Sequence, residues 1–85
     1  MDLDKLKAGL ERLTGYDYEA AEKAVRAMGD TTAEIALSKN FQAAIAAKAL
    51  GKNLDDIKAL PIKDYAVITS VVFDFLFSGL AGLAR

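Results

Sequence analysis

The sequence contains no histidine and no cysteine in its 85 residues. It therefore lacks the most common general base, the thiol nucleophile and the soft ligands that zinc sites use. Its serines have no histidine to activate them, and its carboxylates and lysines are distributed as on solvated helix faces. We expect a protein that is not an enzyme and that binds no metal or cofactor.

Neither sign of charge is in clear excess. The 11 basic and 12 acidic residues give a formal net charge of -1. Such a balance offers no basic surface to a phosphate backbone, so we expect no contact with DNA or RNA. The start of the chain has neither the basic region nor the apolar run of a secretory signal, so we expect the chain to stay inside the cell.

No segment alternates apolar and polar residues as a strand does, whereas helical spacing recurs along most of the chain. The pattern predicts an all-α fold, a compact bundle of four to five helices in a single domain over residues 1–85. The expected helices span residues 4–13, 18–28, 31–50, 54–59 and 62–78. Gly15, Gly29 and Gly51 are expected to end the first three. Thr31 and Glu34 have the spacing of a capping box at the start of the third.

The third expected helix has the composition of a central packing element. Leu37, Phe41 and Ile45 repeat every four residues, and alanines fill the other sides. Small side chains let neighbouring backbones approach closely. We therefore expect the other helices to pack around this one, with the second helix capped by Asp17.

The last third of the chain carries more apolar surface than one helix on a small domain can easily hide. Between Tyr65 and Ala84 only Asp74 is charged. A helix that is apolar nearly all round is buried, inserted in a membrane or bound to a partner. A membrane span over residues 65–84 is one alternative, but Asp74 near mid-membrane would cost about 2.5–3.5 kcal/mol, and serines and glycines dilute the run.

The faces of this helix can be separated at about 100° per residue. The expected core face contains Tyr65, Ile68, Val72, Phe75 and Leu76. A mostly polar stripe opposite contains Lys63, Val67, Ser70, Asp74 and Ser78. Beside that stripe lies the apolar flank, which we define as Ala66, Phe73, Phe77 and Leu80. We expect the apolar flank to bind a partner; in the alternative, the first two helices fold over the flank and bury it.

Five segments, in their order and spacing, resemble the tail assembly chaperones of long-tailed bacteriophages and related prophages. The segments are residues 13–23, 28–30, 46–51, 60–65 and 71–76. In that family a leucine-threonine-glycine segment leads into an acid-rich helix, and a leucine-proline turn leads into a closing helix that ends in phenylalanine-leucine. Family members commonly have a strand-forming segment before this helical part, whereas residues 1–10 here have a helical pattern.

The resemblance implies a non-catalytic role in the host bacterial cytoplasm. Such chaperones bind the tape measure protein, keep it soluble, help tail tube protein subunits polymerise around it, and are absent from the mature virion. The apolar flank would cover a helical client by helix-in-groove packing. Several copies, or a homo-oligomer, would supply the total binding. Family members are often also made as a longer, frameshifted form.

A second resemblance leads to a different class of function. Thr14, Gly15 and Tyr16, followed by an alanine-rich helix and another glycine, resemble part of the three-helix ubiquitin-associated domain. That resemblance covers about half of the chain and implies a protein-binding surface around Tyr16 and Leu37. It leaves the C-terminal helix without a role.

Overall fold

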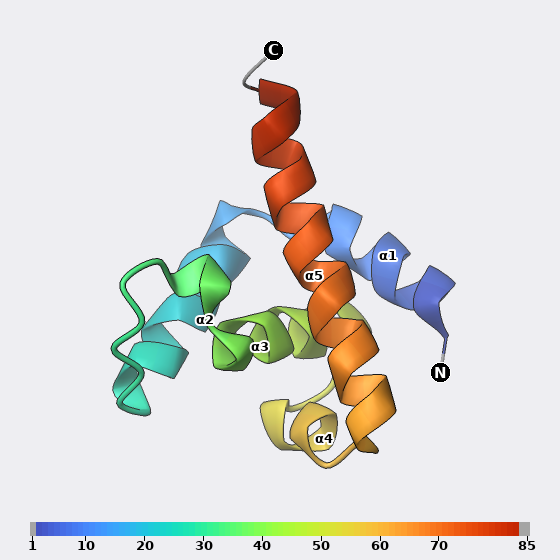
Figure 1. Ribbon diagram of the computed structural model, residues 1–85, viewed down its shortest axis with the longest axis horizontal. Helices are drawn as coiled ribbons and strands as arrows, with labels where there is room; N and C mark the ends of the chain where they lie inside the picture. Colours follow the sequence, from blue (N-terminus) through green and yellow to red (C-terminus); the bar gives the residue numbers. More distant parts are fainter. Residues whose placement is uncertain (1, 84–85) are drawn as a thin grey trace.

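The computed structural model describes the backbone of residues 2–83 and the side chains of residues 2–78. Within this range the chain forms five α-helices and one short 3-10 helix (Figure 1). They are α1 (Leu3–Arg12), α2 (Gly15–Ala27), η1 (Ile35–Leu37), α3 (Lys39–Leu50), α4 (Leu54–Lys58) and α5 (Ile62–Leu83). The expected all-α fold and compact bundle are confirmed.

Helix α3 is the central element, as its composition predicts. Helices α1, α2, α4 and α5 all pack against it (Figure 1). Phe41 and Ile45 are buried, together with five alanines of the same helix. Gly9 of α1 lies so close to the backbone of α3 that a methyl group there would come within 2.1 Å of the Ala49 carbonyl oxygen. Gly51 ends α3 in the left-handed conformation, with φ 67°.

The start of α3 differs from the expectation. The helix begins at Lys39 and is capped by Ser38, whose hydroxyl accepts from the Phe41 amide at 3.2 Å. The expected capping box at Thr31 and Glu34 is therefore wrong. Glu34 instead caps the short helix η1, by accepting from the backbone amide two residues on. Leu37, expected in the core, lies in η1 with 54% of its surface exposed.

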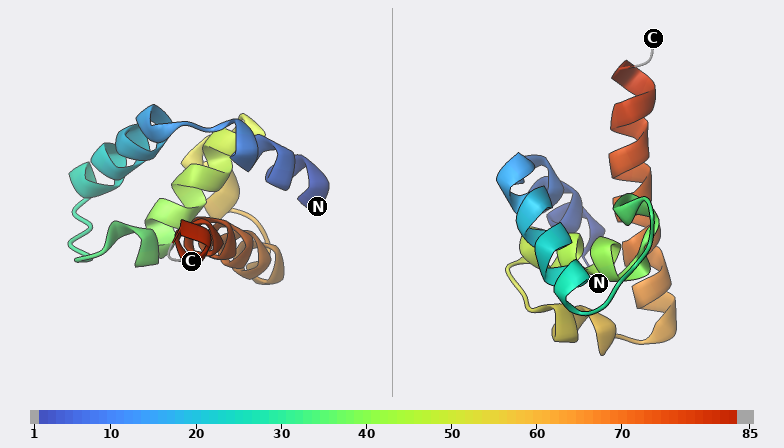
Figure 2. Two further views of the ribbon diagram at one scale, coloured as in Figure 1. Left: turned by 90° about the horizontal axis from the view of Figure 1, so that it is seen from above. Right: turned by 90° about the vertical axis from the view of Figure 1, so that its left-hand side faces the viewer.

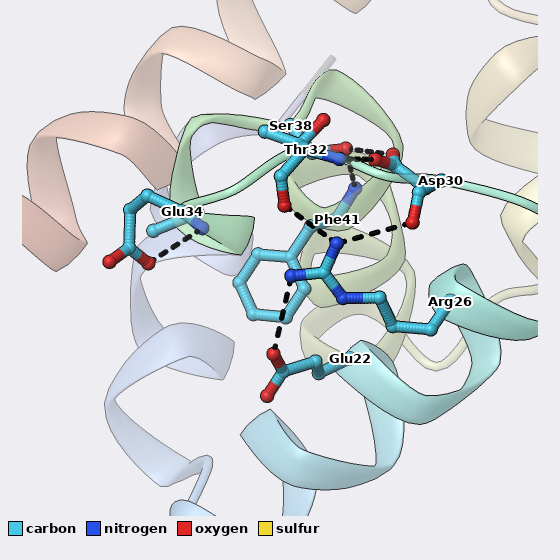
Figure 3. Close-up of polar contacts among 8 residues, drawn as sticks. Glu22, Arg26, Asp30, Thr32, Glu34, Ser38 and Phe41 are labelled. Carbon is cyan, nitrogen blue, oxygen red and sulfur yellow. Dashed lines mark hydrogen bonds and ion pairs between the residues drawn. The ribbon is translucent and has the colours of Figure 1, made fainter.

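A network of polar contacts explains why residues 29–38 do not continue α3 as an α-helix (Figure 3). Arg26 Nη1 donates to the backbone carbonyls of Asp30 at 3.1 Å and Thr32 at 2.6 Å. The Asp30 carboxylate accepts from the Thr32 amide at 2.9 Å, from the Ser38 hydroxyl and from Asn40 Nδ2 at 3.1 Å. The hydrogen bond from the Ser38 hydroxyl contributes most to holding the pKa of Asp30 well below its usual range, and the bonds from Thr32 and Asn40 lower it further. The side chains satisfy polar groups that a helix would otherwise pair internally.

The junction between α1 and α2 also differs from the expectation. Helix α2 begins at Gly15, not near Tyr18, and Thr14 is its N-cap. The Asp17 carboxylate reaches back to accept from the Thr14 amide at 2.9 Å, which completes a capping box. Gly15 is not a left-handed helix end: among the described glycines, positive φ occurs at Gly29 and Gly51 alone.

Helix α5 crosses α3 and then projects beyond the other helices. Its first half packs on α3, and its red C-terminal turns stand clear of the bundle in two views (Figures 1 and 2). The helix continues to Leu83, five residues past its expected end at Ser78. We call residues 73–83 the distal half of α5.

Candidate functional site

The buried face of α5 agrees only in part with the expected core face. Ile68 and Val72 are fully buried, and Tyr65 and Leu76 are partly buried against the core. Phe75 was expected in the core, but 41% of its surface is exposed, because it faces an open hollow between α1 and α5. That part of the expected core face is wrong.

A threonine takes a place in the core that the sequence pattern had not assigned to it. Thr69 is fully buried, and its hydroxyl donates to the carbonyl oxygens of Tyr65 at 3.0 Å and Ala66 at 3.2 Å. Because its own helix satisfies the hydroxyl, Thr69 packs like an apolar residue. The buried face is thus rotated toward Thr69 and away from Phe75. The residues of the expected polar stripe are exposed.

The apolar flank lies on the side of α5 that the other helices leave partly open. Ala66 is exposed, Phe73 is 36% exposed and Phe77 is partly buried. The rings of Phe73 and Phe77 lie against each other, with centroids 4.5 Å apart. The side chain of Leu80 lies outside the described residues. The alternative in which the first two helices bury the whole flank is therefore wrong, and partner binding by the flank stays a prediction.

Three adjoining hollows line the side of α5 that faces α1, α2 and η1, and Leu76 contributes to all of them. We call this surface the apolar groove. The first hollow, about 280 Å³, lies among Leu10, Glu11, Leu13, Thr14, Gly15, Tyr18, Ile45, Phe75 and Leu76. The second, about 750 Å³, lies among Lys7, Leu10, Glu11, Val71, Asp74, Phe75, Leu76 and Ser78. The third, about 370 Å³, lies among Tyr18, Glu34, Ala36, Leu76 and Phe77.

Tyr18 forms the middle of the wall opposite α5. Its ring packs edge-on against Phe41, with centroids 4.7 Å apart. Burial, together with the negative charges of Glu34 and Glu22, raises the pKa of the Tyr18 hydroxyl above its ordinary value. Tyr18 therefore gives the groove an aromatic wall that ends in a neutral hydroxyl group.

The groove has the composition of a surface that binds apolar side chains. Leucine, isoleucine, tyrosine and phenylalanine side chains line it, together with four charged residues. Helix-binding grooves hold the apolar stripe of a partner helix in this way. Of the described residues of the apolar flank, Phe77 lines one of these hollows, whereas Ala66 and Phe73 line none of the three. The sequence pattern does not predict the opposite wall, because the leucine stripe of α1 contains no information on which helix it will face.

The structure also tests the alternative in which residues 65–84 span a membrane. Within the part of the chain that the structure describes, no helix combines the length and the apolar character needed to cross a bilayer.

Comparison of the chain with protein-family models, with curated proteins and with solved structures gives no match. The resemblance to tail assembly chaperones therefore depends on the five sequence segments alone. Two of these segments meet at the first hollow, which is lined by Leu13, Thr14, Gly15 and Tyr18 of the first segment and by Phe75 and Leu76 of the last.

Proposed function

We propose that this protein is a non-catalytic chaperone that covers the apolar face of a helical client. The observation that carries the proposal is the distal half of α5, which presents partly exposed phenylalanines beside an open apolar groove. A chain of this size gains stability by hiding such side chains, and here they remain accessible. A client helix laid along α5 would bury Phe75 on one side and Phe77 on the other.

The expected affinity of a single site is modest. Burying a phenylalanine completely is worth roughly 1.5–3 kcal/mol, and Phe73, Phe75 and Phe77 are already partly covered, so each would add about 1 kcal/mol. Association costs several kcal/mol of lost freedom, so one site binds weakly. Several copies on one long client would hold it firmly and could still be displaced one at a time.

The client that fits this mode of binding is a long, largely helical protein with exposed apolar stripes. The family resemblance gives its identity as the tape measure protein of a long-tailed phage or prophage. In this proposal the chaperone acts in the host bacterial cytoplasm, yields the client to polymerising tail tube protein, and is absent from the mature virion. The meeting of two resembling segments, residues 13–23 and 71–76, at the first hollow of the groove supports this assignment.

A second candidate function has one observation in its favour. Tyr16 is 87% exposed at the start of α2, where a ubiquitin-associated domain would present a contact residue. Tyr16→Ala separates the two candidates. Loss of client binding with an unchanged fold would favour the second candidate, whereas unchanged binding would favour the apolar groove.

The test is co-expression with the tape measure protein of the same phage or prophage. Phe75→Asp should leave the client insoluble, because it places a charge in the groove. Val67→Asp is the matched control: Val67 lies on the polar stripe of the same helix and is 40% exposed, against 41% for Phe75. Phe77→Asp should act like Phe75→Asp, with helicity by circular dichroism unchanged. Equal solubilisation by all variants would refute the proposal.

A further inference from the structure

The charged side chains around the apolar groove are mostly of one sign. Among the described residues, the charged side chains that line its three hollows are Lys7, Glu11, Glu34 and Asp74. Lys7 and Glu11 lie one turn apart on α1, so their charges largely offset each other. Glu34 remains at the third hollow and Asp74 at the second, and we call these two residues the acidic margin of the groove.

Two carboxylates lie near the Tyr18 hydroxyl on the groove wall. Burial is the largest cause of the raised pKa of this hydroxyl, and the negative charges of Glu34 and Glu22 raise it further. Glu22 is partly neutralised by Arg26, at 3.7 Å, whereas the Glu34 side chain accepts a single backbone hydrogen bond from Ala36 among the described contacts. The chain as a whole is almost neutral, with a formal charge of -1, so the acidic margin is a local feature.

We propose that the partner of the apolar groove is an amphipathic helix whose apolar stripe is flanked by lysine or arginine. This inference depends on the proposed function and specifies the chemistry of its client. Basic side chains beside the stripe would meet Glu34 at the third hollow and Asp74 at the second. The second hollow follows α5 from Val71 to Ser78, a length of about two helical turns.

The same charges disfavour a second copy of this chain as the occupant. A second copy that inserted its α5 phenylalanines would bring its own Asp74 to a groove that Glu34 and Asp74 already line. Like charges across an interface suppress association. The acidic margin thus selects a basic client over self-association.

The test uses two synthetic amphipathic peptides of about four turns. Both carry the same leucine stripe, which is flanked by lysines in one and by glutamates in the other. The attraction between a peptide lysine and Glu34 or Asp74, with the two unit charges about 7 Å apart in water, should raise the affinity about threefold for each acidic side chain. The lysine peptide should therefore bind the full chain at least about tenfold more tightly at low salt, and the difference should shrink at about 1 M NaCl, where screening is short-ranged.

Two charge variants locate the effect. Glu34→Gln with Asp74→Asn should weaken binding of the lysine peptide about tenfold. Asp55→Asn with Asp64→Asn removes the same charge in α4 and in the first turn of α5, and should change binding less than twofold. Equal binding of both peptides, or equal losses in the two variants, would overturn the inference and leave the proposed function standing. Failure of both peptides to bind would overturn both.

Discussion

Gly9→Ala should destabilise the protein although alanine is the better helix former. Gly9 lies in α1 where this helix touches the backbone of α3. An added Cβ would lie 2.1 Å from the Ala49 carbonyl oxygen and 2.7 Å from its carbon, whereas ordinary contacts are 3.4–4 Å. Since the obstacle is backbone, α1 itself must move away by about 1 Å or more. That movement loosens the packing of Leu6 and Leu10, whose exposed fractions are 0% and 1%.

The magnitude follows from two opposed effects. Overpacking of this kind costs about 1–3 kcal/mol, and a backbone obstacle favours the upper end. Alanine regains about 1 kcal/mol through its helix propensity. The net loss is therefore about 2 kcal/mol, which corresponds to a Tm lowered by about 8–16 °C in a domain of this size.

Gly15→Ala is the matched control. Gly15 begins α2, its φ is not positive, and no atom lies within 4 Å of an added Cβ. This substitution should leave stability unchanged or raise it by up to about 1 kcal/mol. Thermal and urea unfolding followed by circular dichroism would measure both variants. A Gly9→Ala protein as stable as the parent would refute the close packing of α1 on α3.

Three further substitutions test other parts of the fold. The folded-state pKa of Asp30 is lowered mainly by Ser38 and Thr32, so its stabilising effect is complete above the ordinary pKa of 3.8 and fades as the pH falls below it. Asp30→Asn should lower the urea midpoint at neutral pH and flatten the loss of stability in acid; a parallel shift at every pH would contradict this. Thr69→Val should change the unfolding free energy by less than about 1 kcal/mol, since the hydroxyl bonds only its own helix; a larger loss by urea unfolding would show that the hydroxyl is required. Gln42→Ala should cost about 2–3 kcal/mol, because the buried amide donates to the Ala36 carbonyl at 2.9 Å and holds η1 on α3; an unchanged urea midpoint would argue against that role.

Local patterns in the sequence predict most of the helices and the central position of α3. These patterns are alanine-rich composition, helical spacing and the glycine at position 51. Each involves residues close together in the chain, so each predicts structure without knowledge of distant contacts. The helical spacing also correctly predicts that Ile68 and Val72 lie in the core. The start of α3 is not predicted correctly, because Thr31 and Glu34 have the local spacing of a capping box, whereas Ser38 caps the helix. Bonds from Asp30 to residues eight and ten positions away favour Ser38, and local spacing does not contain them.

Of the two walls of the apolar groove, the sequence gives information only on the one formed by α5. The helical wheel separates the faces of α5, but it contains no information on how far α1 diverges from α5. It therefore predicts Phe75 in the core, whereas Phe75 faces the hollow between the two helices. The opposite wall requires the positions of α1 and α2, which depend on packing between distant segments. Gly9 gives no signal in the sequence, although the approach of α1 to α3 at this residue helps to place that wall.

The central claim is that a client helix lies in the apolar groove. The most direct measurement is methyl NMR of the full chain during titration with a helical segment of the tape measure protein. The account predicts shift changes at Leu10, Ile45 and Leu76, which line the groove, with Ile57 and Ile62 unchanged. Changes confined to Ile57 and Ile62, or none at any of these methyl groups at saturating client, would contradict it.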